Sequence, residues 1–247
     1  MNNANNGITL SINDWNVETG DFGGIMTHTP ENNTICYTST DGNIVIPSDT
    51  DVFGANILSN TYEDGMGVIT FDNAVSMIGE KAFYEASTLA SVVLPKTITY
   101  IGVNAFRRCT SLSSITLPEH LQTIDKLAFG NCETLSEITI PNSVTTIKYG
   151  AFLQCYQLES ITIPDSVEII EERVFGDCPS IKNFYGKFST EDNKALIVDD
   201  VFIAYAVGNE ATSYSIPHNV KVIGESAFCA GYNLRDISMP QSLEEIH

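Results

Sequence analysis

Basic residues are scarce in this chain. Its 247 residues include 12 lysines and arginines against 31 aspartates and glutamates, which gives a formal net charge of −19. Nucleic acids and anionic membrane surfaces attract proteins through clustered positive charge, so the composition argues against both as partners. The excess of acids is typical of a highly soluble protein, and it also fits a basic or calcium-bridged partner.

Long apolar runs are missing as well. No stretch approaches the 18 or more apolar residues of a transmembrane helix, so we expect no membrane insertion. The first 20 residues contain neither the basic nor the apolar segment of a signal peptide. We therefore expect either an intracellular protein or a mature form to which Met1 was added. Residues 242–247 fall inside a repeat, which suggests a fragment of a longer protein.

Motifs of metal sites and of catalysis are also absent from the sequence. The six cysteines form no CxxC motif, and the four histidines stand in unrelated contexts. There is no nucleophile elbow and no phosphate-binding glycine loop. The acidic pairs Glu191-Asp192 and Asp199-Asp200 lack the spacing of a calcium-binding loop. We therefore expect no cofactor, no metal and no enzymatic activity.

The dominant feature that is present is a repeat of 23 residues. Its clearest copies start at Leu112, Leu135 and Leu158 and read LSSITLPEHLQTIDKLAFGNCET, LSEITIPNSVTTIKYGAFLQCYQ and LESITIPDSVEIIEERVFGDCPS. A fixed period with fixed apolar positions is the signature of a stacked-repeat protein, or solenoid. The sequence therefore predicts one coil of the chain, which we call a rung, for each repeat.

Each repeat begins with a short predicted strand. Apolar and polar residues alternate there, the period-2 pattern of a half-buried strand, and a proline that cannot donate to a sheet usually follows. Stacked rungs place these strands side by side in a parallel sheet, and apolar pairs such as Leu121/Ile124 then carry the chain around a bend. The inward pairs are Ile69/Phe71, Val92/Leu94, Ile115/Leu117, Ile138/Ile140 and Ile161/Ile163.

Most repeats then carry an Ala-Phe pair and, three residues after the phenylalanine, a cysteine. Ala105, Cys109 and Leu112 are spaced i, i+4, i+7, which predicts one face of a short helical turn. We expect the phenylalanines of neighbouring rungs to stack into a continuous column. Adjacent cysteines come close enough for a disulfide bridge. Ala86 and Gly231 occupy the same position in two copies, however, and favour reduced thiols in a small buried slot.

Residues 1–43 do not follow the repeat. They contain short β-like runs such as 7–12, and a solenoid needs a cover over its open end. We interpret this segment as an N-terminal β cap and residues 44–247 as the solenoid domain. Within the solenoid, residues 44–46 are predicted as the first strand and residues 48–67 as a loop or a degenerate convex segment.

An insert interrupts the array near its end. Phe228, the next phenylalanine of an Ala-Phe pair, follows Phe175 by 53 residues, which is 30 more than one period of 23. The extra residues fall within about 182–213, where two β-rich runs flank the acidic pair Asp199-Asp200. This pattern predicts a β-hairpin.

The consensus LxxIxIPxxVxxIxxxAFxxCxx of residues 69–247 resembles the BspA-like, or Treponema-type, leucine-rich repeat. The resemblance implies an α/β fold: a right-handed leucine-rich-repeat solenoid with a parallel sheet on its concave face and short helical or irregular turns on its convex face. Known members are mostly cell-surface or secreted proteins associated with adhesion. The resemblance therefore implies an extracellular or cell-surface location.

The side chains free to bind a partner are those that point outward from the predicted sheet. They form a strip of hydroxyl groups with scattered carboxylates on an extended platform, and the insert adds tyrosines. Threonine also suits an exposed strand without any binding role, and aromatic residues of the insert also suit a core. The candidate ligand-binding residues are Ser114, Thr116, Glu137, Thr139, Ser160, Thr162, Tyr185 and Tyr205.

Three functions remain open at this point. The first is non-enzymatic adhesion, in which a monomer binds a host, matrix or other microbial surface protein through the concave sheet and the insert. The second is a structural spacer or display module for flanking domains. The third is glycan binding through the tyrosine-rich insert.

Overall fold

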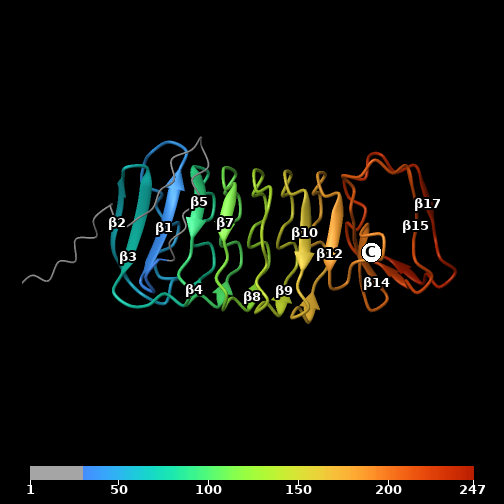
Figure 1. Cartoon of the computed structure of the whole chain (residues 1–247), viewed down its shortest axis with the longest axis horizontal. Coiled ribbons are helices and arrows are strands. Elements are labelled where there is room, and N and C mark those ends of the chain that lie inside the picture. The colour runs from blue at the N-terminus through green and yellow to red at the C-terminus, as the bar shows by residue number, and fades with distance from the viewer. Residues whose placement is uncertain (1–29) are drawn as a thin grey trace, which may run out of the picture.

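The rungs stack in a straight row along the long axis of the molecule (Figure 1). The structure is a computed structural model that describes residues 30–247, and the β-like run at 7–12 lies outside the described residues. A regular rung has three sides: a longer strand, a strand of two residues and a segment of turns. No helix occurs in the described part of the chain. The predicted solenoid with parallel sheets is confirmed.

The first side of the rungs carries the longer strands. They pair in parallel at the predicted period, for example Ser91 of one rung with Ser114 of the next. Residues 137–140 form no strand, so the strand predicted there is wrong and the sheet is interrupted at this rung. Its inward isoleucines are nevertheless buried. The strands of this side are β5 (Leu89–Val93), β7 (Ser114–Thr116), β10 (Ser160–Ile163), β12 (Asn183–Gly186), β15 (Ser213–Ser215) and β17 (Asp236–Ser238).

The second side is an unbroken five-stranded parallel sheet. The second residue of each of its strands is a buried isoleucine. These isoleucines, for example Ile124 of the pair Leu121/Ile124, were expected only at a bend of the chain, but they belong to a sheet. The strands are β4 (Met77–Ile78), β6 (Tyr100–Ile101), β8 (Thr123–Ile124), β9 (Thr146–Ile147) and β11 (Ile169–Ile170).

The third side is a row of turns, and the predicted helical turn is wrong. Asn104 and Arg108 have φ values of 56° and 64°, in the left-handed region that a right-handed helix of L-residues does not contain. Hydrogen bonds between rungs hold this conformation, because the Phe106 N–H donates to the Ala128 carbonyl at 2.8 Å. Equivalent bonds recur in the neighbouring rungs. Bonds to the next rung thus override the local helical spacing.

The predicted phenylalanine column is confirmed. Centroids of neighbouring rings lie 5.3 to 5.6 Å apart, and their planes are within 7° of parallel. The rings of Phe53 and Phe184 lie against the two ends of the column at 5.8 and 5.4 Å and are strongly tilted. The column itself consists of Phe83, Phe106, Phe129, Phe152 and Phe175, all of which are buried.

The cysteines that recur with the repeat fill a buried slot beside this column, as predicted. Each thiol donates to the carbonyl of the phenylalanine 26 residues earlier, at 3.1 to 3.3 Å. Burial raises the pKa of the Cys178 thiol to about 12, so the thiol stays protonated and keeps its donor. The four cysteines are Cys109, Cys132, Cys155 and Cys178, and all are free.

Three antiparallel strands lie at the N-terminal end of the described chain: β1 (Thr34–Ser39), β2 (Ile57–Glu63) and β3 (Met66–Phe71). β1 lies between β3 and β5 and is antiparallel to both. The inward pair Ile69/Phe71 therefore does not start the parallel sheet, which begins at β5. Residues 44–46 form no strand, and β2 lies within the predicted loop. The division into a cap at 1–43 and a solenoid domain stays a prediction.

The predicted hairpin is confirmed. β13 (Ala195–Val198) and β14 (Val201–Tyr205) pair antiparallel around Asp199-Asp200. β14 is also part of a rung, because it pairs in parallel with β16 (Val222–Ile223). β16 pairs in turn with β18 (Glu245–Ile246).

The insert is consequently much shorter than predicted. The Tyr205 N–H donates to the Ala227 carbonyl at 2.8 Å, as the column phenylalanines do in their own rungs. Tyr205 lies 30 positions after Phe175 and 23 before Phe228. Residues 182–213 therefore hold a degenerate rung with seven extra residues, and the sequence pattern misses this rung because tyrosine replaces phenylalanine.

Candidate functional site

Seven of the eight predicted binding residues lie on one exposed face. We call this surface the strand face: it comprises the outward side chains of β7, β10 and β12 and of residues 137–139 between them. All seven are solvent-exposed. They are Ser114, Thr116, Glu137, Thr139, Ser160, Thr162 and Tyr185.

Core packing determines which side chains form this face. Ser114 and Thr116 point outward, while Ile115 between them is buried, and the same alternation recurs in β10. A shift of one residue in register would bury the hydroxyl groups and expose the isoleucines. The face begins at β7, because Val93 of β5 is only 7% exposed where it pairs with Cys36 of β1.

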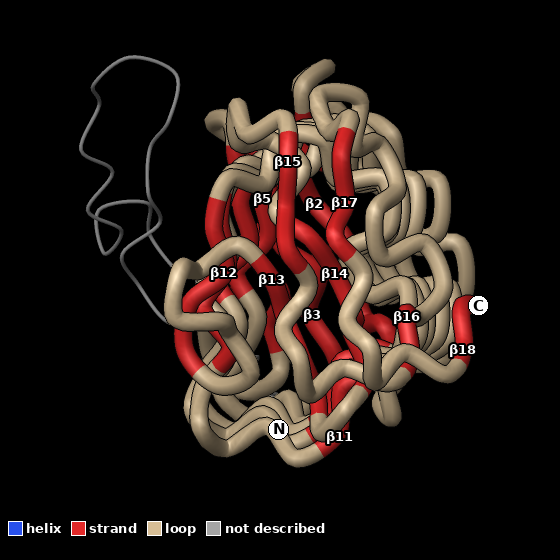
Figure 2. Tube along the Cα trace, turned by 90° about the vertical axis from the view of Figure 1, so that its right-hand side faces the viewer, coloured by secondary structure: helices blue, strands red, loops and turns tan. Residues whose placement is uncertain are grey.

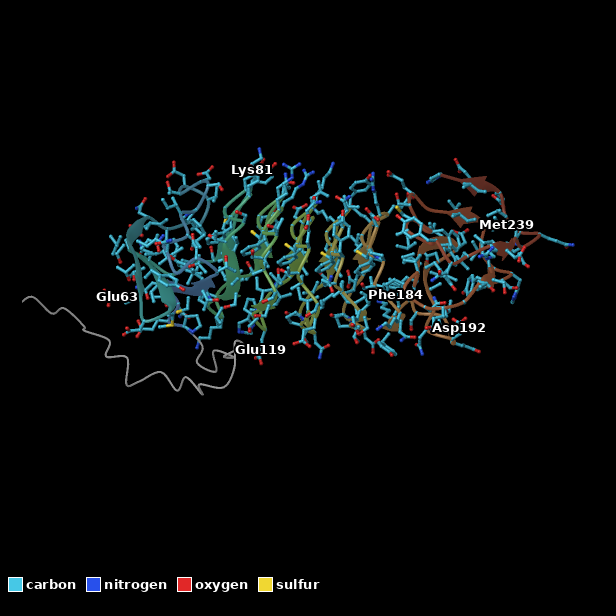
Figure 3. All side chains as sticks on the ribbon, turned by 90° about the horizontal axis from the view of Figure 1, so that it is seen from above. Glu63, Lys81, Glu119, Phe184, Asp192 and Met239 are labelled. Atoms are coloured by element: carbon cyan, nitrogen blue, oxygen red, sulfur yellow. The ribbon has the colours of Figure 1, made fainter. Side chains whose placement is uncertain are left out.

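Hydroxyl groups dominate the chemistry of this surface, and Glu137 adds a carboxylate. Glu159, at its edge, pairs with Lys182 at 3.2 Å, and more than half of both side chains is exposed. Such exposed pairs are weak, so the Glu159 carboxylate remains available to other cations. Figure 3 shows Glu119 and Asp192 projecting on one side of the stack and Lys81 on the opposite side. The surface therefore suits a partner that donates hydrogen bonds and carries positive charge.

Tyr185 adds an aromatic side chain that is 41% exposed. Gly186 follows it with a φ of 81°, and a Cβ at this position would clash with the Ile163 carbonyl oxygen, so only glycine fits. The Lys187 ammonium group then donates to the Val167 carbonyl at 2.6 Å. These contacts hold the end of β12 against the previous rung and so position Tyr185.

Lys187 takes over a contact that hydroxyl groups make in several regular rungs. Ser143 donates to the Leu121 carbonyl at 2.6 Å, and Ser166 donates to the Val144 carbonyl at 2.7 Å. We call this contact the hydroxyl clasp. In the sequence it is visible only as a serine or threonine directly before the apolar residue of the bend.

Tyr205, the eighth predicted residue, is buried, and its assignment to the binding surface is wrong. It is 4% exposed, and its ring packs at 4.6 Å from Tyr214 and 5.5 Å from Phe228. Burial raises the pKa of Tyr205 and raises that of Tyr214 to about 12. Tyr205 fills the core of the last rungs, so its ring cannot stack on a sugar.

A buried carboxylate on the second side was not predicted. Asp125 is 5% exposed, and one of its oxygens accepts from the Tyr100 hydroxyl at 2.6 Å and from the Lys148 ammonium at 3.1 Å. Burial alone would raise the pKa of Asp125, but these donors and the Lys126 N–H outweigh it, so the pKa is lowered. The three side chains come from adjacent rungs, and their hydrogen bonds tie those rungs together.

Within residues 30–247, no three histidine, cysteine, aspartate or glutamate side chains group to hold a metal ion. No helix of this part of the chain is long and apolar enough to cross a membrane. What the geometry offers is an exposed polar surface over a buried core.

A family model described as BspA type leucine rich repeat region matches residues 62–182 and 203–247, in six copies. The part between the two matches holds most of the hairpin, where the extra residues break the period. Among curated proteins, none matches the chain significantly.

Solved leucine-rich repeat structures share the fold. A protein from Bacteroides ovatus is 26% identical with a TM-score of 0.54, and the alignment covers 74% of this chain and 44% of that one. A protein from Eubacterium ventriosum is 21% identical with a TM-score of 0.57, covering 71% and 48%. The pneumococcal vaccine antigen PcpA is 20% identical with a TM-score of 0.51, covering 77% and 55%. The chain thus spans about half the length of these relatives.

Proposed function

Because the chain belongs to the family of BspA-type leucine-rich repeat proteins, we propose that it is a non-enzymatic module that binds a protein partner on its strand face. Repeat proteins commonly use such extended faces for binding. The observation that carries the proposal is the exposure of seven regularly spaced side chains over a buried core. Tyr185 supplies the residue type that is enriched at binding hot spots.

The chemistry of the strand face favours a basic partner surface. Its one charged side chain, Glu137, is a carboxylate, and the whole chain carries a net charge of −19. The partner is a host, matrix or other microbial surface protein, and the module acts as a monomer at the cell surface or outside the cell, as the family resemblance implies. A glycan partner has less support, because Tyr205 is buried.

A binding panel tests this function. The immobilised chain is exposed to fibronectin, laminin, collagen and fibrinogen in surface plasmon resonance, and we expect at least one to bind with an affinity that falls as salt rises. Tyr185→Ala should weaken that binding about tenfold. The matched control is Tyr232→Ala, because Tyr232 is 86% exposed but lies outside the strand face. Equal affinities of both variants and the parent would contradict the proposal, as would the absence of any binding.

A spacer or display module is the second candidate. The straight stack of regular rungs favours it (Figure 1), as does the coverage of about half of each relative. For a spacer, alanine replacement of all seven strand-face residues should leave the attachment of the protein to cells unchanged. For a binding module, the same replacement should abolish attachment.

A further inference from the structure

The insert rung forms a partition between two hydrophobic cores. Along β14 and the residues after it, Ile203 and Ala206 pack into the core of the preceding rungs, whereas Phe202 and Val207 pack into the core of the following rungs. Both faces of this stretch are therefore buried, unlike those of the outer strands. In the end-on view of Figure 2, β13 and β14 lie inside the outline formed by the other strands of this end.

A shortened corner explains why the chain passes through the interior here. Phe202 pairs with Ile223 of the next rung. In the next rung, five positions separate the strand residue Ile223 from Phe228 on the turn side. In the insert rung, only three positions separate the corresponding residues, Phe202 and Tyr205. The chain lacks two residues that would carry it around the outside of the corner, so it crosses inside.

The regular hydrogen-bond ladders break at this rung on every side. The second-side sheet ends at β11, and a separate sheet of β13, β14, β16 and β18 follows. On the first side, β12 and β15 belong to different sheets. On the turn side, the regular bonds end with the Gln154 N–H to the Gly176 carbonyl, and the Gly208 N–H to the Ile181 carbonyl at 2.7 Å spans the break.

A cluster of polar side chains, which we call the latch, bridges the outside of this boundary. The Arg173 guanidinium donates to the Glu225 carboxylate at 2.7 Å, and the Tyr149 hydroxyl donates to its other oxygen at 2.7 Å. The Glu172 carboxylate accepts from the Glu225 N–H at 2.9 Å. Residues 52 to 76 positions apart thus meet across the shortened corner.

We propose that this boundary is a hinge at which residues 195–247, which hold the sheet of β13, β14, β16 and β18, open as one unit from the preceding rungs, and that the latch sets how often it opens. Cooperative units of a fold separate where hydrogen bonds and apolar contacts are least continuous. Here the parallel ladders of the three sides stop, and the core divides in two. Side-chain contacts and a few isolated backbone bonds, such as the Ile197 N–H to the Phe188 carbonyl, replace those ladders. Tyr185 and the rest of the strand face lie on the N-terminal side of the hinge, so opening leaves that surface intact. The hinge therefore does not depend on the proposed binding function.

Hydrogen exchange of the full chain, followed by mass spectrometry, tests the hinge. Amides of β14, β16 and β18 should exchange together and faster than those of β6, β8 and β9. Arg173→Ala should speed exchange in the first group about two- to fivefold, the range for a partly exposed ion pair, and leave the second group unchanged. Glu225→Gln should do the same, which separates loss of the latch from loss of the arginine stem.

The control is Arg108→Ala, because the Arg108–Glu85 pair is also 2.7 Å long but lies within the preceding rungs. It should leave exchange in β14, β16 and β18 at the parent rate. Uniform exchange across all rungs would overturn the hinge. So would latch variants that speed both groups equally or change neither.

Discussion

Phe129 occupies the middle of the phenylalanine column, and its removal measures how strongly the column stabilises the fold. Its ring is fully buried. The ring lies 5.4 Å from Phe106 and 5.5 Å from Phe152, with planes within 7° of parallel. Phe129→Ala removes this ring and leaves a cavity between its two neighbours.

The cavity cannot close easily. The Phe129 N–H donates to the Ala151 carbonyl at 2.8 Å, and the sheet of the second side fixes the rungs at their spacing. Replacing a buried phenylalanine by alanine costs about 3–5 kcal/mol, and incomplete relaxation places this site near the upper end. Two lost ring contacts act in the same direction. We therefore expect Phe129→Ala to lower the free energy of unfolding by about 4–5 kcal/mol.

Urea unfolding followed by circular dichroism gives this free energy. The control is Phe228→Ala, since Phe228 is only half-buried and stacks on Phe202 at 4.9 Å near the other end of the array. We expect it to cost about half as much. If Phe129→Ala prevents folding, Phe129→Leu should still fold at a cost of about 1–2 kcal/mol. A cost for Phe129→Ala no larger than that of Phe228→Ala would refute the continuous column as a source of stability.

Single side chains elsewhere give three further tests. A thiol reagent should modify Cys229 rapidly in the folded protein and the other five cysteines only after unfolding. Cys229 is exposed, whereas the others are buried, and burial raises the pKa of thiols such as Cys132. Mass spectrometry of the labelled protein measures which cysteines react. Ser166→Ala should lower the free energy of unfolding by about 1 kcal/mol in urea, because it removes a hydroxyl clasp, whereas Ser160→Ala on the strand face should change it by less than about 0.5 kcal/mol. At neutral pH, Asp125→Asn should have a lower free energy of unfolding than the parent. This difference should disappear as the pH falls through 3.8, the ordinary pKa of an aspartate, and below. The pKa of Asp125 is lowered in the folded protein, so its contribution is present above that pH and disappears when it is protonated; unfolding curves at a series of pH values measure the difference.

The repeating features could be predicted because they depend on local spacing alone. The Ala-Phe pair predicts the ring column, since identical residues one period apart must meet on adjacent rungs. The cysteine slot and the alternation of residues such as Ser114 and Ile115 follow in the same way. Seven of the eight expected surface residues are exposed for this reason.

The turn side could not be read from the same pattern. The spacing of Ala105, Cys109 and Leu112 fits a helix, but left-handed residues at positions such as Arg108 exclude one. What stabilises that conformation is the bond to the next rung, which no single repeat contains. Asn131 and Asp177 at equivalent positions suit a left-handed backbone, but arginine at this position in another repeat gives no such signal.

The two ends of the array depend on contacts that are distant in sequence. β1 lies between β3 and β5 because Tyr37 pairs with Gly67 on one side and with Val92 on the other. No period in the sequence specifies that arrangement. The wrong prediction for Tyr205 has a related cause. Tyrosine there fills a core position that is displaced by seven residues from the repeat, so the sequence pattern assigns it to an exposed insert.

The binding role of the strand face is tested most directly by hydroxyl-radical footprinting of the chain, with and without the panel protein that it binds. We predict that the partner protects the Tyr185 side chain. Met77 on the second side and Tyr232 near the C-terminal end are also exposed, and they should keep their reactivity. Protection of Met77 or Tyr232 with Tyr185 unchanged would contradict the assignment of the strand face as the binding surface.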